Sequence, residues 1–329
     1  MEITKHEQRS MLKFIPWIIL LSVVCTIAAS SRDIIVIFRS YEPGSDKLFS
    51  AIRNELSAQY IIYDMIITSD SKSNEFDFAI RRWNPSLAVL IGGSSVRLYA
   101  DYQKKLPDQP RKLPSLLLVT TQNAHFQSRI PNSVAINLDV PISTSLLTMQ
   151  SVYRVRLENP GILHSSTLNK EIEFEKELLR RNTITLSPVR IDKKRFGLSA
   201  QIQEGISRLV DTIHIDCLIL PNEPELFTDD LIPVWRSCLS QSGLPVISNC
   251  TVSGLDSCDF VSCTLFPDTL SVTAQVVRKI KRIKANGWQA DTPEIDHIIS
   301  IKKIANLKCI GQISNISSDI FKTFDGFVE

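Results

Sequence analysis

The stretch Leu87–Ala100 reads LAVLIGGSSVRLYA and decides the fold class of this chain. Its run of apolar residues up to Ile91 is typical of a parallel strand that is buried on both faces. The glycines that follow permit a tight turn, and Ser94 or Ser95 can cap the helix that the next residues predict. The free backbone N–H groups of such a helix start attract anionic or polar ligand groups. The stretch therefore predicts a strand, a polar binding turn and a helix.

The same construction recurs at Asp216–Leu226, which reads DCLILPNEPEL. From Asp33 to Leu87 the chain runs 54 residues, and from Gly161 to Asp216 it runs 55. Each interval holds the pattern strand, helix, strand, helix, so the repeat is one of architecture. The predicted fold is α/β with two similar lobes, each a parallel sheet covered by helices, and a hinge between them. Loops at the carboxyl ends of the strands would then line a cleft.

Hydrophobic periodicity places the individual elements along the chain. We expect strands at 33–38, 60–67, 87–91, 115–120, 134–138, 161–165, 183–189, 216–220, 245–248 and 260–265. We expect helices at 46–56, 74–83, 96–105, 143–151, 169–181, 199–209, 229–241 and 269–284, with Phe76, Phe78, Ala79 and Trp83 facing inward on the second of them.

The N-terminus is a targeting segment. Basic residues up to Lys13 precede the apolar run Phe14–Ala29, and small residues follow it. This order is typical of an export signal, with an uncleaved membrane anchor as the alternative. Lipid attachment at Cys25 is disfavoured because the bulky Val24 precedes it. We expect a periplasmic or otherwise extracytoplasmic protein, anchored through its N-terminus if the segment is retained.

The length of 329 residues suggests two domains of ordinary size, and 43% hydrophobic residues suffice for real cores. We divide the chain into a signal or anchor at 1–30, an N-terminal lobe at 32–142, a C-terminal lobe at 143–296, and a return segment and tail at 297–329. The hinge is placed at Ser143–Ser151 and near 297–313. The net charge of +2 gives no indication of nucleic-acid binding. The basic run Arg278–Lys284 suits the C-terminal end of a helix.

Six of the seven cysteines lie in the second half of the chain. Cys217 and Cys309 fall in apolar runs and are interpreted as core thiols. Cys250 and Cys258 stand eight residues apart across a glycine-containing loop, so a disulfide between them is one hypothesis. A zinc site of Cys250, Cys258 and Cys263 is a weaker one, because it lacks paired C-x-x-C spacing and a fourth ligand. We expect no metal and no cofactor.

Four short stretches resemble a known family. They are Arg39-Ser40-Tyr41-Glu42-Pro43 with Ser45-Asp46, Ile91-Gly92-Gly93-Ser94-Ser95, Leu220-Pro221-Asn222-Glu223, and Ser300-Ile301-Lys302-Lys303-Ile304-Ala305-Asn306. They are similar to motifs of the ABC transporter substrate-binding proteins with a periplasmic-binding type I-like fold, in the branch associated with the uptake of aromatic amino acids and related compounds. The resemblance spans about residues 32–310. It implies a small-molecule ligand between the lobes and a membrane permease as partner.

Two departures from the family pattern concern the ligand. Glu42 stands where the family has a histidine, and Ser262–Asp268 replaces a glycine-bearing stretch before the last long helix. The cleft could therefore bind a different ligand or none.

The candidate ligand-binding residues follow predicted strands and offer hydrogen-bonding or stacking groups. They are Arg39, Ser40, Tyr41, Gly93, Ser94, Ser95, Thr121, Ser165, Ser166, Asn222, Glu223, Asn249 and Phe266. Each has a plainer interpretation: the serines as helix caps, Arg39 as a surface arginine, the aromatic residues as packing, and Asn222 and Glu223 as part of an ordinary turn.

Motifs of hydrolases, P-loop enzymes, zinc proteases and dinucleotide enzymes are absent from the sequence. We therefore expect no enzyme, and a hydrolase with an unrecognised site ranks last. The first hypothesis is an exported solute-binding protein that captures a small polar ligand, amino-acid-like or similar, for an ABC permease. The alternative is a membrane-tethered, degenerate binding domain used for sensing or as a scaffold for protein partners.

Overall fold

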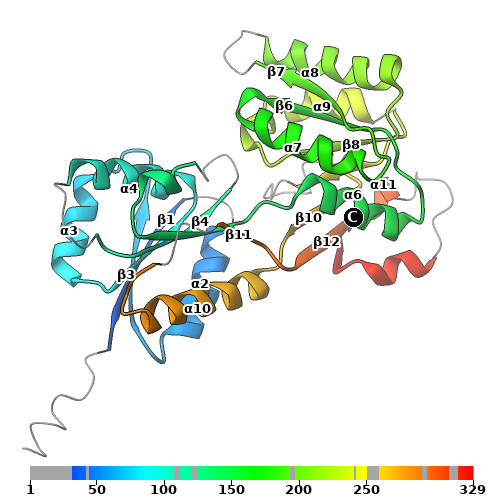
Figure 1. The fold of residues 1–329 in the computed structure, drawn as a ribbon. Helices are drawn as coiled ribbons and strands as arrows, with labels where there is room; N and C mark the ends of the chain where they lie inside the picture. Colours follow the sequence, from blue (N-terminus) through cyan, green and yellow to red (C-terminus); the bar gives the residue numbers. More distant parts are fainter. Residues whose placement is uncertain are drawn as a thin grey trace, which may run out of the picture.

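The structure is a computed structural model that describes residues 32–41, 44–106, 112–120, 125–192, 197–240, 242–249, 259–290, 295–310 and 318–328. These residues form two α/β lobes joined by crossing segments (Figure 1). The predicted fold class is confirmed. Among the described residues no helix is long and apolar enough to cross a membrane. The N-terminal apolar run lies outside them.

Lobe 1 is built on a six-stranded parallel sheet in the order β11-β5-β4-β3-β1-β2. The strands are β1 (Ile34–Ser40), β2 (Ile61–Ile67), β3 (Leu87–Ile91), β4 (Ser115–Val119), β5 (Ser133–Asn137) and β11 (Ile295–His297). The helices are α2 (Ser45–Leu56), α3 (Asn74–Trp83), α4 (Gly93–Lys105) and α10 (Thr269–Ala285), with the 3-10 turn η1 (Gln127–Arg129). The apolar sides of α2 and α10 share one core on one face of the sheet, and those of α3 and α4 share another on the opposite face.

Lobe 2 has a seven-stranded sheet in the order β13-β12-β10-β9-β8-β6-β7. The pairing of β12 with β10 is antiparallel and the other pairings are parallel, so β12 and β13 run opposite to the remaining strands. The strands are β6 (Pro160–Ser165), β7 (Ser187–Ile191), β8 (Cys217–Leu220), β9 (Val246–Ser248), β10 (Cys263–Pro267), β12 (Ile301–Asn306) and β13 (Gly326–Val328). The helices are α6 (Ile142–Tyr153), α7 (Asn169–Arg180), α8 (Leu198–Ser207), α9 (Ile232–Leu239) and α11 (Leu307–Ile310); the shorter turns are η2 (Ser166–Leu168), η3 (Arg208–Ile213), η4 (Pro224–Leu226) and η6 (Ser318–Thr323).

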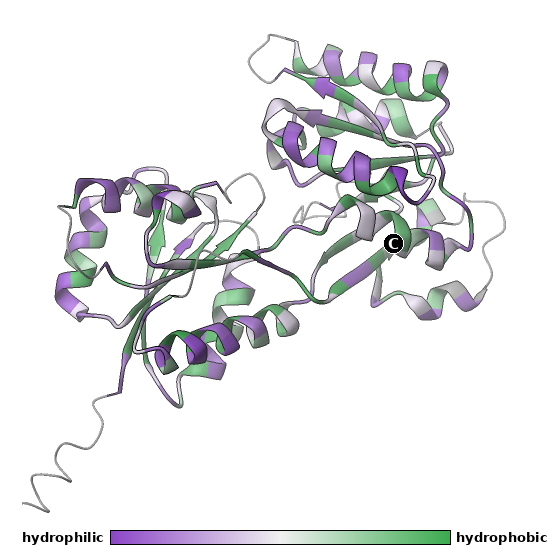
Figure 2. Ribbon diagram, in the orientation of Figure 1, coloured by the Kyte–Doolittle hydropathy of each residue, from purple (hydrophilic) through white to green (hydrophobic). Residues whose placement is uncertain are grey.

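The cores of lobe 2 follow the same plan, with α6 and α7 on one face of the sheet and α8 and α9 on the other. Figure 2 shows the consequence: central strands such as β3 and β8 are hydrophobic along their length, whereas the helices carry both hydrophobic and hydrophilic residues. The strand order β2-β1-β3-β4-β5 of lobe 1 recurs as β7-β6-β8-β9-β10 in lobe 2. The predicted repeat of architecture is confirmed.

Three segments cross between the lobes in the described part of the chain: 138–141 after β5, Asp268 between β10 and α10, and 298–300 between β11 and β12. The backbone N–H of Asp268 donates to the carbonyl of Ser300 at 3.0 Å, so the last two segments lie side by side.

The lobe boundaries differ from the division expected from the sequence, which assigned residues 143–296 to the second lobe. Helix α10 packs beside α2 in lobe 1, and β11 extends the lobe 1 sheet, with His297 opposite Asn137 of β5. The physical reason is the apolar side of α10, because Val272 and Val276 complete the same core as α2.

Smaller differences have local causes. Phe78 is 62% exposed rather than inward, because two helical positions are about 200° apart and Phe76 occupies the buried side. Strand β7 begins at Ser187 rather than Thr183, since Ile184 and Leu186 reach the core from the segment before it.

The described cysteines are free thiols. Cys217 and Cys309 are buried, as predicted. Cys263, one ligand of the zinc hypothesis, is also buried. Cys250 and Cys258 lie outside the described residues, and so does the predicted disulfide.

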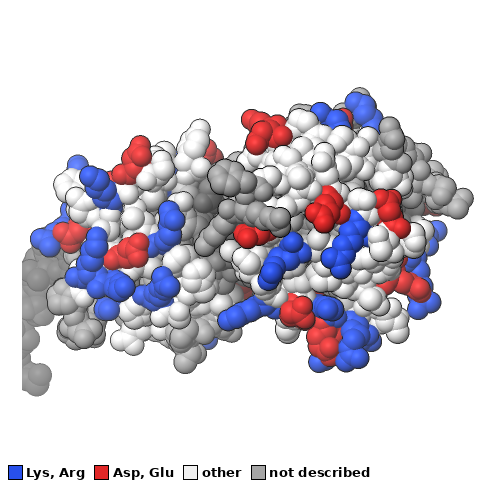
Figure 3. All heavy atoms as spheres, turned by 90° about the horizontal axis from the view of Figure 1, so that it is seen from above, with Lys and Arg blue, Asp and Glu red and all other residues white. Residues whose placement is uncertain are grey.

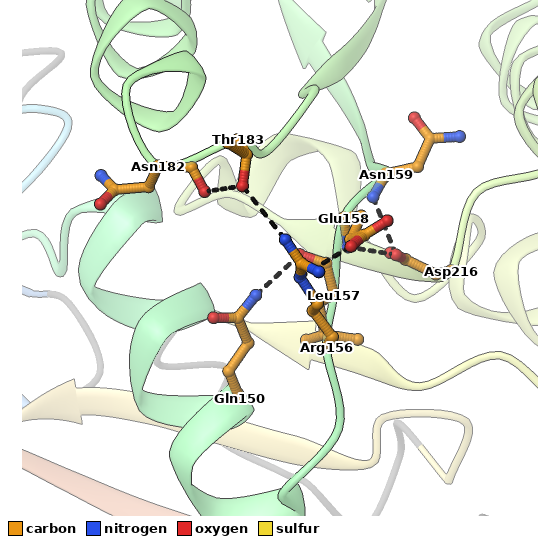
Figure 4. Close-up of polar contacts among 8 residues, drawn as sticks. All are labelled: Gln150, Arg156, Leu157, Glu158, Asn159, Asn182, Thr183 and Asp216. Carbon is orange, nitrogen blue, oxygen red and sulfur yellow. Dashed lines mark hydrogen bonds and ion pairs between the residues drawn. The ribbon is translucent and has the colours of Figure 1, made fainter.

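A polar network fixes the segment that leads from α6 into lobe 2 (Figure 4). One carboxylate oxygen of Asp216, just before β8, accepts hydrogen bonds from the backbone N–H groups of Glu158 and Asn159, the latter at 2.8 Å. The amide of Gln150 donates to the Leu157 carbonyl at 2.8 Å. These bonds hold the start of β6 against β8 and α6, so the lobe 2 sheet begins at a defined position.

Candidate functional site

The first wall of the candidate site is the carboxyl end of the lobe 1 sheet, where β1 ends at Ser40 and β3 leads into α4. The hydroxyl of Ser40 accepts a hydrogen bond from the backbone N–H of Ser95 at 2.9 Å. The hydroxyl of Ser95 donates to the carbonyls of Ile91 and Gly92 at 2.9 and 2.8 Å. Both serines are therefore used in joining β1 to the start of α4.

Ser94 differs from these two serines. It is half-buried in the first turn of α4, beside Gly93, and its hydroxyl makes no hydrogen bond to the part of the chain that the structure describes. The turn before it needs a glycine, because Gly92 has φ 89° and ψ 160°, a conformation that side chains rarely adopt. Among the described serines of this wall, Ser94 thus presents a hydroxyl that no other described residue engages.

Arg39 and Tyr41 lie on either side of Ser40 in the chain. The guanidinium of Arg39 forms ion pairs with Asp46 of α2 and, at 3.5 Å, with Asp64 of β2. Its side chain is only 11% exposed and lies over the Phe49 ring at 4.8 Å. Arg39 therefore points to the α2 side of the sheet and already has two carboxylate partners. Tyr41 is 80% exposed at the rim.

The second wall is the carboxyl end of the lobe 2 sheet, and its centre is a buried carboxylate. Glu223 is 0% exposed. It accepts hydrogen bonds from the backbone N–H of Ser165 at 2.8 Å, from the Ser165 hydroxyl, and from the Thr167 hydroxyl at 3.0 Å. Ser165 and Glu223, which the sequence predicted as ligand-binding residues after two separate strands, thus lie together and hydrogen-bond to each other. Ser166 lies beside them and is exposed.

His164 precedes Ser165 in β6 and is buried, with its ring nitrogen Nδ1 2.9 Å from the Ser165 carbonyl. Burial lowers the pKa of His164, because desolvation disfavours the charged imidazolium. A neutral imidazole that donates from Nδ1 suits this contact.

The floor between the walls is the first crossing segment. Asn222, after β8, donates to the Asp139 carboxylate at 2.7 Å. Asn249, after β9, donates to the Val140 carbonyl at 3.0 Å and accepts from the Ser145 hydroxyl at 2.7 Å. The two asparagines therefore fasten lobe 2 to the crossing segment. Sequence reasoning missed Asp139 and Ser145, although Asp139 follows β5 in the way that Asn222 follows β8.

Two further predicted ligand-binding residues, Phe266 and Thr121, belong to other parts of the chain. Phe266 lies in β10, half-buried and opposite Lys302 of β12, beside the second crossing segment. Thr121 lies outside the described residues, directly after Thr120, which is half-buried at the end of β4. The described groups at these positions are hydroxyls, amides and carboxylates, which can hydrogen-bond a small polar molecule. Within the described ranges no three His, Cys, Asp or Glu side chains gather to hold a metal.

Comparison by sequence found no matching family model and no matching curated protein. Comparison of structures found many similar chains. A ligand-free, open substrate-binding protein with adhesive properties from Clostridium difficile has a TM-score of 0.66 at 13% identity, covering 90% of this chain and 99% of that one. An ABC domain in complex with L-Trp from Streptococcus pneumonia has a TM-score of 0.57 at 14% identity, covering 90% and 100%.

The fold is therefore that of the two-lobed, type I-like binding proteins. Within this class, the chain is similar in structure to ABC transporter substrate-binding proteins, which confirms the resemblance noted in the sequence at the level of the fold. A lac repressor dimer bound to operator is also similar, with a TM-score of 0.50 at 14% identity, covering 85% of this chain and 96% of that one. These structures are binding proteins and a repressor rather than enzymes.

Proposed function

We propose that this chain is an exported solute-binding protein that captures a small polar ligand, amino-acid-like or similar, between its lobes and presents it to an ABC permease. The observation that carries the proposal is the arrangement of the two walls. Polar groups from Ser94, Asn222 and Asp139 gather at the carboxyl ends of two repeated sheets, beside the segments about which such lobes close. The similar substrate-binding proteins support it, since they share this architecture over nearly their whole length.

The proposed ligand contacts follow from which groups are already engaged. Ser94, Tyr41 and Ser166 would contact the ligand first. Ser40, Ser95, Ser165, Glu223 and Asn249 would shape the walls from behind, because other residues occupy their polar atoms.

The second candidate is the membrane-tethered, degenerate binding domain used for sensing or as a scaffold. One observation favours it: the strongest polar groups of the walls, Arg39 and Glu223, are bound by the protein itself. A small ligand of the kind that the resembled family binds could not use these two side chains.

Thermal denaturation with a panel of amino acids and small organic acids separates the two. A ligand at a hundred times its Kd stabilises the folded chain by about 2.7 kcal/mol, which raises the Tm by several degrees. A shift with one chemical class supports the solute-binding protein, and calorimetric titration then gives the affinity. No shift across the panel favours the scaffold, which needs no small ligand.

A further inference from the structure

The two lobes carry opposite charge. Residues 32–137 and 269–297, which form lobe 1, contain 18 Lys and Arg against 13 Asp and Glu. Residues 138–268 and 298–329 contain 16 against 20. On the face seen in Figure 3, Lys and Arg outnumber Asp and Glu on lobe 1, at the left, and the two signs are mixed on lobe 2. A chain with a net charge of only +2 is thus electrically polarised.

Part of the positive charge gathers where β1 begins. We name this region the base of lobe 1 and define it as Arg32, Asp33, Lys281 and the last turns of α2, α3 and α10. Asp33 connects these ends: its carboxylate accepts from the Ser86 hydroxyl at 3.4 Å, just after α3, and pairs with Lys284 of α10 at 2.8 Å. The last turns contribute Arg53, Arg81, Arg82, Arg282 and Lys284.

Three cations of the base have no carboxylate partner among the described residues. Arg53, Arg82 and Lys281 are exposed and form no ion pair with any residue that the structure describes. The described carboxylates at or near the base are Asp33, which is paired, Asp77, which pairs with Arg81 at 2.9 Å, and Glu55.

At the corresponding end of lobe 2, two of the cations have carboxylate partners. There Arg156 pairs with Glu158 at 2.7 Å (Figure 4), and Arg180 pairs with Glu177 at 3.1 Å. Lobe 2 also keeps exposed cations without a described carboxylate partner, namely Arg154 and Arg208 at the ends of α6 and α8. What distinguishes lobe 1 is its excess of Lys and Arg over Asp and Glu.

Aromatic rings accompany these cations. The ammonium group of Lys284 lies over the Tyr60 ring at 5.1 Å, and the half-buried Trp288 meets Tyr60 edge to face at 6.4 Å. Tyr60 is 3% exposed and belongs to the core, so of these two rings only the half-buried Trp288 reaches the surface, and Trp is a side chain that prefers the headgroup region of a bilayer.

The sequence supplies the position of a membrane. The apolar run Phe14–Ala29 ends three residues before Arg32. Since a residue spans at most about 3.6 Å, a retained run would hold Arg32 within on the order of 10 Å of the lipid surface. This is close to the Debye length of about 8–10 Å at physiological salt, so the charges of the base would act on the headgroups.

We propose that the base of lobe 1 docks on the anionic lipid surface of the membrane that holds the N-terminal run. This proposal extends the membrane-tethered form of the proposed function and does not depend on whether the cleft binds a ligand. It fixes the orientation of the protein: α2, α3 and α10 end at the lipid, and the carboxyl ends of the lobe 1 strands face away from it.

The test uses the full chain, with retention of residues 1–31 verified by intact mass, in vesicles of phosphatidylcholine with or without phosphatidylglycerol. Lysines are acetylated with a water-soluble reagent, and the modification rates are read by mass spectrometry. Lys281 at the base should react about tenfold more slowly on anionic vesicles than on neutral ones, and high salt should abolish the difference. Lys176, exposed on α7 of lobe 2, is the control within the same molecule and should not change.

A double variant then tests whether the basic residues of the base cause the protection of Lys281. Each basic residue near an anionic surface strengthens attraction about fivefold, so R53Q/R82Q should remove most of the protection of Lys281. The matched variant K170Q/R208Q, at two exposed positions of lobe 2, should retain it. Equal rates for Lys281 on both vesicles would overturn the proposal, as would equal slowing of Lys176 or protection by duplex DNA without vesicles. Ligand titrations on the same sample report the proposed function separately.

Discussion

Replacing Glu223 by alanine tests whether a carboxylate organises the second wall. Its side chain is 0% exposed and accepts from the Ser165 N–H at 2.8 Å and the Thr167 hydroxyl at 3.0 Å, besides the Ser165 hydroxyl. The hydroxyls can turn to other acceptors, but the backbone N–H would stay buried and unpaired at a cost of about 1–3 kcal/mol. With the lost hydroxyl bonds, we expect E223A to lower the free energy of unfolding by about 2–4 kcal/mol.

The assay is urea denaturation followed by circular dichroism. With a slope of about 1–3 kcal/mol per molar urea, the loss should lower the midpoint by about 1 M or more without changing the slope. E223Q should cost roughly half as much, because its amide oxygen can still accept from the Ser165 N–H. E173A, at an exposed position of α7, is the control and should stay within about 0.5 kcal/mol of the parent chain. A midpoint for E223A equal to that of E173A would refute the reasoning.

Three further outcomes are expected. S95A should lower stability by about 1 kcal/mol, because the Ser95 hydroxyl bonds to the Ile91 and Gly92 carbonyls, whereas S94A should leave the Tm unchanged and weaken ligand binding in calorimetry. Because burial lowers the pKa of His164, the unfolded chain takes up its proton first as the pH falls; stability should therefore be complete above the ordinary pKa of 6.5 and decline below it, and H164Q should flatten this decline in denaturation curves. With N-ethylmaleimide, the partly accessible Cys238 should react well before Cys263, whose buried thiol has a raised pKa, as peptide mass spectra would show.

Each of these has a contrary result. Equal loss of affinity in S94A and S95A would contradict the separation of a ligand-facing from a structural serine. A pH dependence that survives in H164Q would assign it to other groups. Rapid labelling of Cys263 in the native chain would show that β10 opens readily.

Local patterns predicted much of the secondary structure because they depend on neighbours in the sequence. The bounds Asn74–Trp83 and Leu87–Ile91 are found as expected, since each stretch has a clear period and a clear stop. The destination of α10 could not be predicted in this way. Its hydrophobic pattern predicts that one side is buried, but that side could have packed on either sheet. Only the three-dimensional structure shows that Val276 lies in the same core as α2.

The candidate site shows the same limit. Asn222 and Glu223 were found because they follow a buried strand, and polar residues at that position line the edges of parallel sheets. Their pairings were not predicted, because Asp139 lies 83 residues from Asn222, and Ser165 lies 58 residues from Glu223. Whether a polar group faces a ligand or another residue depends on such distant pairings.

The placement of α10 and β11 also constrains how the chain is made. Lobe 1 begins at Ile34, but its core lacks Val272 and Val276, and its sheet lacks β11, until residue 297 has left the ribosome. Lobe 2, by contrast, has most of its strands in one continuous stretch. The half that is synthesised first is therefore completed late.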